Sequence, residues 1–236
     1  MTRSAGLALI LALCGCGAAP APRTPRLDPE ALFAQVAPSV VYTRARYEAA
    51  PDDVTVDTGV GVLIHASGLV LTSCHQLTHS DDGVKAKEIE LLLAEPDPVR
   101  HTFRPSAPIK ADVVACSDEP DLGLVRMRGG GHGRAPIALA TALPRPGGWF
   151  AVVGAEAAAE TRKGMTPGTV IQSGCHVNPM SGSPAIDAVG RIVGLHLFSR
   201  YNTDEPPEEV NYYLGADEIE RFVAPYLAKE VAPPTR

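Results

Sequence analysis

The amino-acid sequence predicts an all-β domain, either a sandwich or a barrel. Short runs rich in Val, Leu and Ile recur between residues 40 and 215, and turn-forming residues separate them. The chain contains 22 glycines and 22 prolines, an excess typical of a fold with many turns. Hydrophobic residues make up 45% of the chain, as in ordinary globular proteins, which excludes extensive disorder.

A short helix is expected at the start of the domain. Asp28 suits the N-cap, and Pro29 suits the first helical position because an N–H there would have no partner within the helix. Leu32 and Val36 then place apolar side chains on one face, until Pro38 ends the helix.

Strands are expected where apolar runs lie between turn residues. Residues 60–64 and 69–72 flank His65-Ala-Ser-Gly68, which predicts a hairpin. The remaining candidate strands span residues 87–93, 111–116, 122–127, 149–154, 169–174, 184–187, 192–198 and 210–214. The glycine-rich segment Arg128-Gly-Gly-Gly-His-Gly-Arg134 divides the strands into two groups and is expected to be a flexible connection.

One longer helix is expected near the end of the chain, over residues 216–228. Apolar residues from Ile219 to Leu227 recur at the three- and four-residue spacing of one helical face. Pro225 is expected to kink this helix. The proline-rich residues 230–236 that follow are expected to be a disordered tail.

The N-terminal segment, residues 1–16, has the features of a secretory signal peptide. Arg3 supplies a positive start, and the apolar run over residues 6–13 is too short to span a bilayer as a permanent helix. Its end, Leu13-Cys-Gly-Cys16, resembles the lipobox of bacterial lipoproteins. The resemblance implies that Cys16 becomes the lipid-modified N-terminus and that residues 17–27 form a flexible tether.

Ordinary signal cleavage without a lipid is the alternative for this segment. Cleavage near Ala19 or Ala21 would then release the chain. A lipid-anchored chain would stay in the cell envelope, in the periplasm or at the outer membrane, whereas an unmodified chain would be secreted. No other segment of the sequence is apolar and long enough to cross a membrane, so the membrane is expected to be contacted only through the lipid.

Three cysteines follow the signal segment: Cys74, Cys116 and Cys175. An oxidising compartment permits a disulfide, and three cysteines allow three pairings, with at least one cysteine left over. A zinc site built from Cys74 and Cys175 with their neighbours His75 and His176 is a further alternative. That set lacks the short Cys-x-x-Cys spacing, so neither a metal nor a cofactor is expected.

Charge and glycine patterning exclude two other classes of partner. The formal net charge is −6 and the isoelectric point is about 5.6, which argues against nucleic acid. The glycine-rich segment at residues 128–134 is not followed by Gly-Lys-Ser/Thr, which a nucleotide phosphate loop requires. Neither nucleic acid nor a nucleotide is therefore expected as a partner.

Three short stretches carry residues suited to nucleophilic catalysis. His75 directly follows the candidate strand 69–72, Asp121 opens the strand 122–127, and Ser181 precedes Gly182 and a further strand. The order His, Asp, Ser is one of the known orders of the catalytic triad. A serine needs a base to take its proton, and the base needs an anion that fixes its tautomer.

Several motifs together suggest a known family. They are Val36-Ala-Pro-Ser-Val-Val41, Gly59-Val-Gly-Val-Leu-Ile64, Gly68-Leu-Val-Leu-Thr-Ser-Cys-His75, Asp121-Leu-Gly-Leu-Val125, Ser181-Gly-Ser-Pro-Ala-Ile-Asp187 and Gly190-Arg-Ile-Val-Gly-Leu-His196. With them, residues 33–227 resemble a trypsin-like serine peptidase domain of the chymotrypsin fold, nearest to the HtrA-type and glutamyl endopeptidase branches. The resemblance implies a domain over residues 28–229 with two antiparallel six-stranded barrels, at about 36–128 and 135–215.

The resemblance also implies the role of each candidate catalytic residue. Ser181 would be the nucleophile, His75 the general base and acid, and Asp121 the anion that orients His75. Asp118 is the nearby competitor for the last role and is expected instead to be a solvated turn residue. The implied activity is hydrolysis of peptide bonds through an acyl-enzyme, in proteins of the cell envelope.

The sequence departs from the family at the oxyanion hole. The hole is formed by the backbone N–H groups of the nucleophile and of the residue two positions before it. That second residue is Pro179, which has no N–H, where the family has glycine. Either a reorganised loop or a side chain such as His176 or Asn178 could supply the missing donor. Otherwise the chain is an inactive pseudopeptidase that binds proteins.

Two histidines bear on specificity. His196 lies where glutamyl endopeptidases place a histidine that contacts an acidic substrate side chain, and His176 falls where they place another pocket residue. Two imidazoles in one pocket would favour a carboxylate over Lys or Arg. The alternative is that His196 is only a strand residue in a compact core. An unrelated β-sandwich would be indicated if His75, Asp121 and Ser181 lay far apart.

Overall fold

The computed structural model describes residues 28–50, 53–78, 83–97, 102–145, 148–156, 159–169, 181–202 and 208–231. The expected signal peptide, Cys16 and the tether over residues 17–27 lie outside these residues. Residues 170–180, which include Cys175, His176 and Pro179, also lie outside them. In the part of the chain that is described, no helix is both long and apolar enough to cross a membrane.

The expected N-terminal helix is α1 (Pro29–Val36). The Asp28 carboxylate accepts hydrogen bonds from the backbone N–H groups of Glu30 and Ala31, which would otherwise lack partners at the helix start. Leu32 and Val36 are buried. Beyond the helix the chain continues as a 3₁₀ turn, η1 (Ala37–Ser39), into the first strand.

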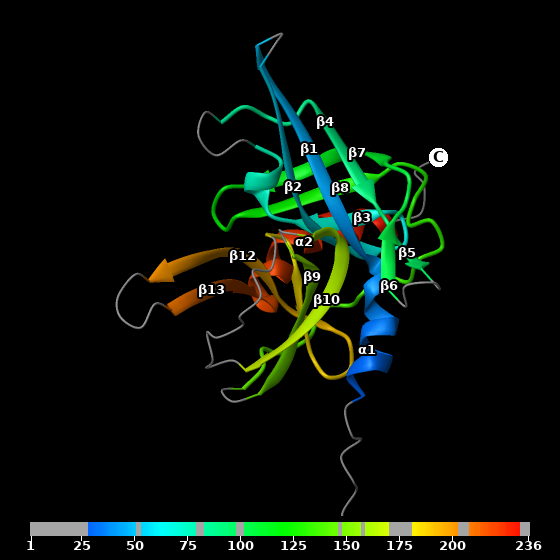
Figure 1. Ribbon diagram of the computed structural model, residues 1–236, viewed down its shortest axis with the longest axis vertical. Helices are drawn as coiled ribbons and strands as arrows, with labels where there is room; N and C mark the ends of the chain where they lie inside the picture. The colour runs from blue at the N-terminus through cyan, green and yellow to red at the C-terminus, as the bar shows by residue number, and fades with distance from the viewer. Residues whose placement is uncertain are drawn as a thin grey trace, which may run out of the picture.

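Six strands form a closed antiparallel barrel in the first half of the chain (Figure 1). They are β1 (Val40–Ala50), β2 (Asp53–His65), β3 (Leu69–Thr72), β4 (Glu88–Leu92), β7 (Ile109–Ser117) and β8 (Leu122–Met127), joined in the order β1-β2-β3-β8-β7-β4. The barrel interior is apolar, with Leu63, Val70, Leu91 and Val125 fully buried. The first barrel implied by the resemblance is therefore confirmed.

The second half of the chain is built on an antiparallel sheet of five described strands, with the order β10-β9-β11-β12-β13. They are β9 (Trp149–Glu156), β10 (Ala159–Thr169), β11 (Pro184–Ile186), β12 (Ile192–Asn202) and β13 (Glu208–Gly215). Five strands, rather than the six expected, are thus present among the described residues of this half. The all-β class and the chymotrypsin-like arrangement agree with the prediction.

Strands β10 (Ala159–Thr169), β5 (Ala94–Asp97) and β6 (Thr102–Pro105) were not expected from the sequence. The strand expected at residues 169–174 cannot be compared, because residues 170–174 lie outside the described part of the chain. The three unexpected segments are polar and contain proline or glycine, so they lack the apolar alternation that predicts a strand. Strand β10 forms because its backbone pairs with β9, from Ala155 to Trp149, and not because of its own propensity.

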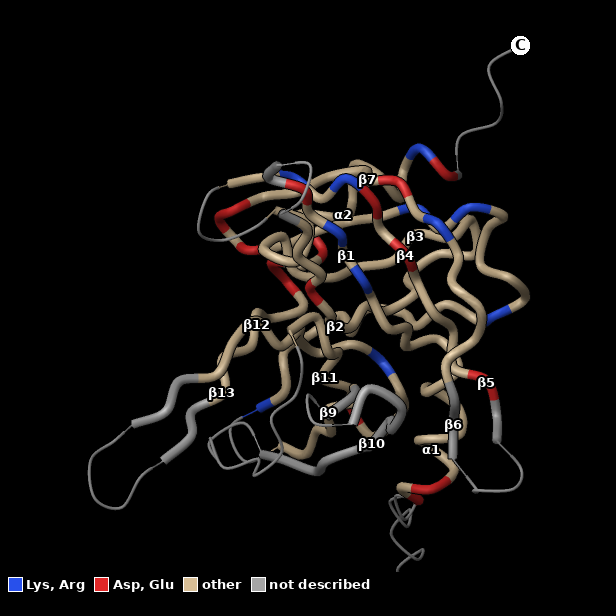
Figure 2. The backbone as a smooth tube through the Cα atoms, turned by 45° about the horizontal axis from the view of Figure 1, so that its top comes forward, with Lys and Arg blue, Asp and Glu red and all other residues tan. Residues whose placement is uncertain are grey.

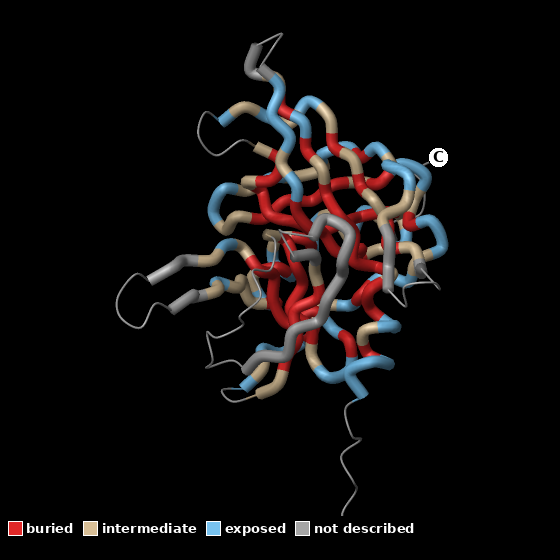
Figure 3. The backbone as a smooth tube through the Cα atoms, in the orientation of Figure 1, coloured by how far each residue is buried: buried red, intermediate tan, exposed pale blue. Residues whose placement is uncertain are grey.

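One hydrophobic core joins the barrel, the sheet and both helices (Figure 3). Val62 and Leu71 reach it from the barrel, Val153 and Leu195 from the sheet, and Ile219 from the C-terminal helix. All five side chains are fully buried. The seam between the two halves is therefore packed, and residues on either side of it are held in fixed relative positions.

The C-terminal helix is α2 (Ala216–Val231), with Ile219 and Val223 buried. It continues past the expected end at residue 228, so residues 230 and 231 are helical instead of belonging to the tail. Glu230 forms an ion pair with Arg126 of β8. This contact fastens the last helical turn to the barrel.

The glycine-rich segment at residues 128–134 is a hydrogen-bonded turn, not a free connection. The Gly131 N–H donates to the Ala66 carbonyl at 3.0 Å, and the Arg134 N–H donates to the Gly131 carbonyl at 2.9 Å. Gly129 and Gly130 have φ angles of 85° and 77°, which glycine adopts without steric cost. The turn therefore packs against the β2–β3 hairpin.

Acidic and basic residues are interspersed over strands β1, β4 and β7 (Figure 2). The ion pairs among them are Arg44–Glu90, Lys87–Glu48, Lys110–Glu88 and Arg128–Asp112. Exposed pairs of this kind contribute little to stability, about 0–1 kcal/mol each. This face of the barrel thus carries interspersed charges of both signs.

Candidate active site

His75 lies on a 3₁₀ turn, η2 (Cys74–Gln76), directly after the fully buried strand β3. The turn is held from the neighbouring strand, because the Tyr47 hydroxyl donates to the Gln76 carbonyl at 2.8 Å. The His75 side chain is 36% exposed. The hydrogen bond from Tyr47 thus holds the backbone of the turn, while the imidazole of His75 remains accessible.

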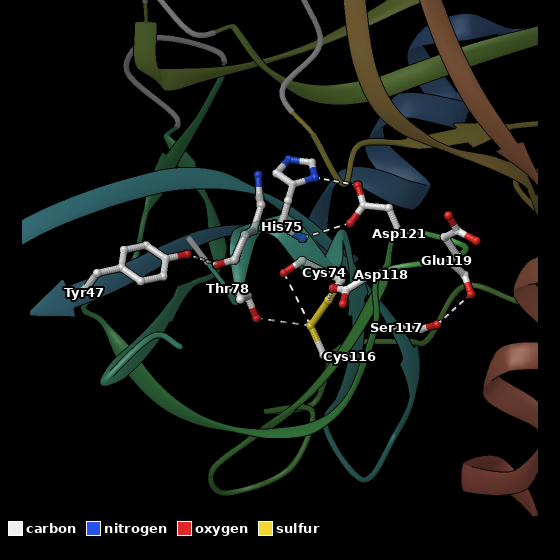
Figure 4. The surroundings of a disulfide bond; sticks show 10 residues. Tyr47, Cys74, His75, Thr78, Cys116, Ser117, Asp118, Glu119 and Asp121 are labelled. Carbon is white, nitrogen blue, oxygen red and sulfur yellow. Dashed lines mark hydrogen bonds and ion pairs between the residues drawn. A yellow bond between two sulfur atoms is a disulfide. The ribbon is translucent and has the colours of Figure 1, made fainter. Parts of the chain in front are cut away.

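Asp121 holds His75 through two hydrogen bonds, one from the ring and one from the backbone (Figure 4). The His75 Nδ1 lies 2.5 Å from the Asp121 Oδ2, and the His75 N–H donates to the Oδ1 at 2.9 Å. Asp121 can come this close because β8 packs tightly on η2. A Cβ on Gly123 would lie 2.9 Å from the Ser73 carbonyl oxygen.

The environment keeps Asp121 ionised. Burial raises the pKa of its carboxyl group, but the hydrogen bonds and the charge of His75, together with the Cys74 backbone, outweigh burial and lower the pKa below the usual value. A carboxylate is the form that accepts a hydrogen bond from the Nδ1–H of His75. The Nε2 of His75 is then left as the acceptor, which is the tautomer a general base needs.

Asp118, the competing acid, takes no part in this pair. It is exposed, and its Oδ1 lies 3.4 Å from the sulfur of Cys74, which forms a disulfide with Cys116 (Figure 4). Of the three pairings that the sequence allows, the structure has this one, with a Cα–Cα distance of 5.1 Å. The sulfur of Cys74 is bonded to Cys116, so it cannot be a ligand of the zinc site that the sequence left as an alternative.

Ser181 lies against the turn that carries His75. Its carbonyl oxygen accepts two hydrogen bonds, from the Val60 N–H at 3.0 Å and from the Gln76 Nε2 at 3.1 Å. The next residue, Gly182, has a φ of 84° and donates its N–H to the His196 carbonyl at 2.8 Å. A Cβ on Gly182 would lie 1.9 Å from the Val60 carbonyl oxygen, so only glycine allows this approach.

The structure therefore brings all three predicted catalytic residues to one seam. His75 and Asp121 come from the barrel, and Ser181 comes from the turn that precedes strand β11 of the sheet. A family model for the trypsin-like peptidase domain matches residues 59–195, which is more than half of the chain and includes the three residues.

The chain belongs to the trypsin-like peptidase family.

Solved structures agree with this assignment at the level of the fold. The crystal structure of a serine endoprotease from Yersinia pestis is similar, with a TM-score of 0.60 and 18% sequence identity. The match covers 82% of this chain and 64% of that one, so the chain spans less than two thirds of the Yersinia protein. The comparison with curated proteins gives no match.

The hydroxyl of Ser181 in this trypsin-like peptidase domain points to the backbone. Its Oγ donates to the Leu197 carbonyl at 2.7 Å. A hydroxyl has one proton, so it cannot donate to His75 in the same rotamer. Rotation about one side-chain bond would release it, and such rotations between staggered positions are ordinary for an accessible serine.

His196 of the peptidase domain is 1% exposed. Its Nε2 lies 3.2 Å from both the Ser199 Oγ and the Asn211 Oδ1, and its ring packs edge-on against Tyr213. Its backbone N–H donates to the Ser183 carbonyl, so His196 adjoins the segment that follows the candidate nucleophile. The other expected pocket residue, His176, and Pro179 of the oxyanion hole lie outside the described residues.

Sequence reasoning missed Gln76 as a residue that contacts Ser181. A glutamine beside a histidine in a mostly polar segment gives a weak signal, because its partners lie in distant segments. The structure shows it buried and bonded to Ser181. A polar residue between Cys74-His75 and Leu77 was the available hint.

Removing the disulfide of the peptidase domain is expected to destabilise it. The bond closes a long loop, since the two cysteines are 42 residues apart, so the double substitution Cys74→Ser/Cys116→Ser should lower the free energy of unfolding by roughly 2–4 kcal/mol. Urea denaturation measures this change. Dithiothreitol should shift the wild-type midpoint and leave that of the double variant in place; equal midpoints for the two proteins without reductant would contradict the expectation.

Proposed function

We propose that this chain is a serine endopeptidase with Ser181 as nucleophile, His75 as general base and Asp121 as the orienting carboxylate. The observation that carries the proposal is the pair of hydrogen bonds from His75 to Asp121, on the turn that also contacts Ser181. This arrangement leaves Nε2 of His75 to act on the serine. Family membership supports the same reaction class.

The reaction follows from these roles. After its hydroxyl leaves the Leu197 carbonyl, Ser181 transfers its proton to the Nε2 of His75 and its Oγ attacks the carbonyl carbon of the substrate peptide bond. His75 then donates that proton to the leaving amine, and an ester forms on Ser181. His75 deprotonates a water that hydrolyses the ester, and the serine is regenerated. Asp121 stabilises the imidazolium formed in each half.

A catalytically inactive protein-binding module is the second candidate function. Pro179 favours it, because a proline two positions before the nucleophile removes one of the two backbone donors that stabilise the oxyanion. The hydrogen bond from the Ser181 hydroxyl to the Leu197 carbonyl also fits this candidate, because a serine in this rotamer does not donate to His75. The complete set of His75, Asp121 and Ser181 favours the enzyme.

For the substrate we propose proteins of the cell envelope, with an acidic residue before the cleaved bond. His196 and His176 are the residues that would favour a carboxylate. Because His196 is buried and bonded to Ser199 and Asn211, a substrate carboxylate would have to replace one of these partners. Replacing His196 by glutamine tests this, since the preference for Glu over Gln in peptide substrates should then disappear.

The proposed location is the cell envelope, with an anchor at Cys16 and secretion as the alternative. The disulfide between Cys74 and Cys116 supports export, because such bonds persist in oxidising compartments. Metabolic labelling with a palmitate analogue tests the anchor. The full-length chain should be labelled, and Cys16→Ser should not be.

A fluorophosphonate probe tests the activity, because it reacts only with an activated serine. The full-length chain, expressed with export, should be labelled and should cleave a peptide library, whereas Ser181→Ala should do neither. Ser183→Ala is the matched control, since Ser183 is two residues away and is not the proposed nucleophile. Silence of the folded wild type would favour the binding module, and labelling that survives in Ser181→Ala would refute the assignment of the nucleophile.

A further inference from the structure

Gln76 is a buried polar residue between the two halves of the molecule. It is 6% exposed, and it directly follows His75 on the turn η2. A buried side-chain amide is unfavourable unless its oxygen and nitrogen both have hydrogen-bond partners. The partners of Gln76 therefore explain why a polar residue is tolerated here.

Thr43 of the barrel and the Ser181 carbonyl fix the orientation of the Gln76 amide. The Thr43 hydroxyl donates to the Gln76 Oε1 at 2.7 Å. The Thr72 Oγ1 lies 3.2 Å from the same oxygen but donates its one proton to the Val60 carbonyl at 2.7 Å. Both threonines are buried. With Oε1 facing the threonines, Nε2 faces the Ser181 carbonyl oxygen at 3.1 Å. The reverse orientation would place two acceptors against each other, so the chemistry allows only this one.

The space around the amide is also restricted. A Cβ on Gly59 would lie 1.7 Å from the Gln76 Nε2, so the amide fills the place that any other residue at position 59 would occupy. The Gln76 backbone is fixed as well, because its carbonyl accepts the Tyr47 hydroxyl. Gln76 is thus held at both ends by the barrel, while its Nε2 reaches a residue of the sheet.

We propose that Gln76 is a positioning residue that sets the place of Ser181 relative to His75. Adjacent residues of one rigid turn then control both reacting side chains: His75 presents the base, and the Gln76 side chain holds the backbone of the nucleophile. The proposal rests on the function proposed above for Ser181 and His75. It adds a side-chain contact that crosses from the barrel to the sheet and ends on the nucleophile itself.

The expected effect is on the chemical step. Catalysis depends on reacting atoms being aligned, and a misplacement of about 1 Å can lower the rate on the order of 100-fold. The Val60 N–H would still hold the Ser181 carbonyl when Gln76 is changed, so the loop should shift without detaching. We therefore expect kcat to fall about 10- to 100-fold while KM changes little.

Two substitutions of Gln76 test the proposal in the full-length chain. Gln76→Glu keeps the size of the side chain and the acceptor for the Thr43 hydroxyl, but it removes the donor to the Ser181 carbonyl. Gln76→Met keeps the size and removes both the acceptor and the donor. Gln35→Glu and Gln35→Met are the matched controls, because Gln35 is an exposed glutamine of α1 outside this network. The measurements are the rate of fluorophosphonate labelling, kcat and KM on a peptide, and the urea midpoint.

Amide hydrogen exchange supplies a readout that does not need an active enzyme. The Val60 N–H donates across the seam to the Ser181 carbonyl, and the Gly182 N–H donates to the His196 carbonyl within the second half, so both report the position of the nucleophile segment. Both should exchange faster in the Gln76 variants, whereas the Ala140 N–H, bonded to Ile192, should not change. If the wild type is not labelled, the proposed activity fails, and the exchange data still test the positioning role.

Several results would overturn the proposal. Unchanged kcat in Gln76→Glu, measured on folded protein, would show that the donor does not position the serine. A lower urea midpoint with faster exchange at every amide, including that of Ala140, would indicate a structural role alone. Equal effects of the Gln35 controls would show that the change is not specific to this contact.

Discussion

Replacing Asp121 by asparagine is expected to lower kcat about 10⁴-fold, which is the cost of the same exchange in well-characterised serine peptidases. The Asp121 carboxylate accepts a hydrogen bond from the Nδ1–H of His75. An asparagine amide can turn its NH₂ group toward Nδ1, which selects the tautomer with the proton on Nε2. That nitrogen can then no longer accept the proton of Ser181. Rates of peptide cleavage and of fluorophosphonate labelling measure the loss.

Asp118→Asn is the matched control for this experiment. The change is chemically identical, and the residue lies three positions away, but Asp118 is exposed and contacts the disulfide instead of His75. Its activity should stay within about twofold of the wild type, as expected for an exposed residue outside the site. A large loss in Asp118→Asn with a small one in Asp121→Asn would reverse the assignment of the orienting acid.

Replacing Pro179 by glycine is expected to raise the rate of labelling and of peptide cleavage. An oxyanion-hole donor contributes on the order of 10²–10³ in rate, and glycine restores the backbone N–H that proline lacks. Because the donor acts on charge that develops in the transition state, kcat should rise more than KM changes. Steady-state kinetics on one peptide substrate separate these two quantities.

Pro136→Gly serves as the control for a loss of proline elsewhere, since Pro136 is exposed and lies in the connection between the two halves. It should leave the rate unchanged. The double variant Pro179→Gly/Ser181→Ala should be silent, which would show that the gained activity comes from Ser181. An active wild type that does not respond to Pro179→Gly would mean that another group already supplies the donor.

These two experiments separate the enzyme from the binding module. If the wild type is silent and Pro179→Gly gains activity, the triad is intact and the oxyanion hole is the defect, so binding becomes the leading function. If the wild type is active and Asp121→Asn is not, the endopeptidase stands. Pro179→Gly therefore tests the oxyanion hole, whereas Asp121→Asn tests whether the triad is used.

Local patterns in the sequence were enough to predict the fold class and several elements. The Asp28 cap, the β2–β3 hairpin around residues 65–68 and the helix α2 all depend on residues close together in the chain. The motifs around His75, Asp121 and Ser181 predicted the family, which the match over residues 59–195 confirms. Strand β10 was not predicted, because its polar residues carry no strand pattern of their own and it pairs through β9.

Only the tertiary structure decided which residues meet. The sequence offered both Asp121 and its competitor Asp118, and barrel closure brings Asp121 to His75 across 46 residues. The pairing of Cys74 with Cys116 spans 42 residues, and the contact of Gln76 with Ser181 spans 105. Periodicity and turn residues report local backbone geometry, whereas contacts at such separations depend on how the barrel and the sheet pack. The sequence by itself thus determined the family and the candidate residues, and packing across the seam determined their geometry.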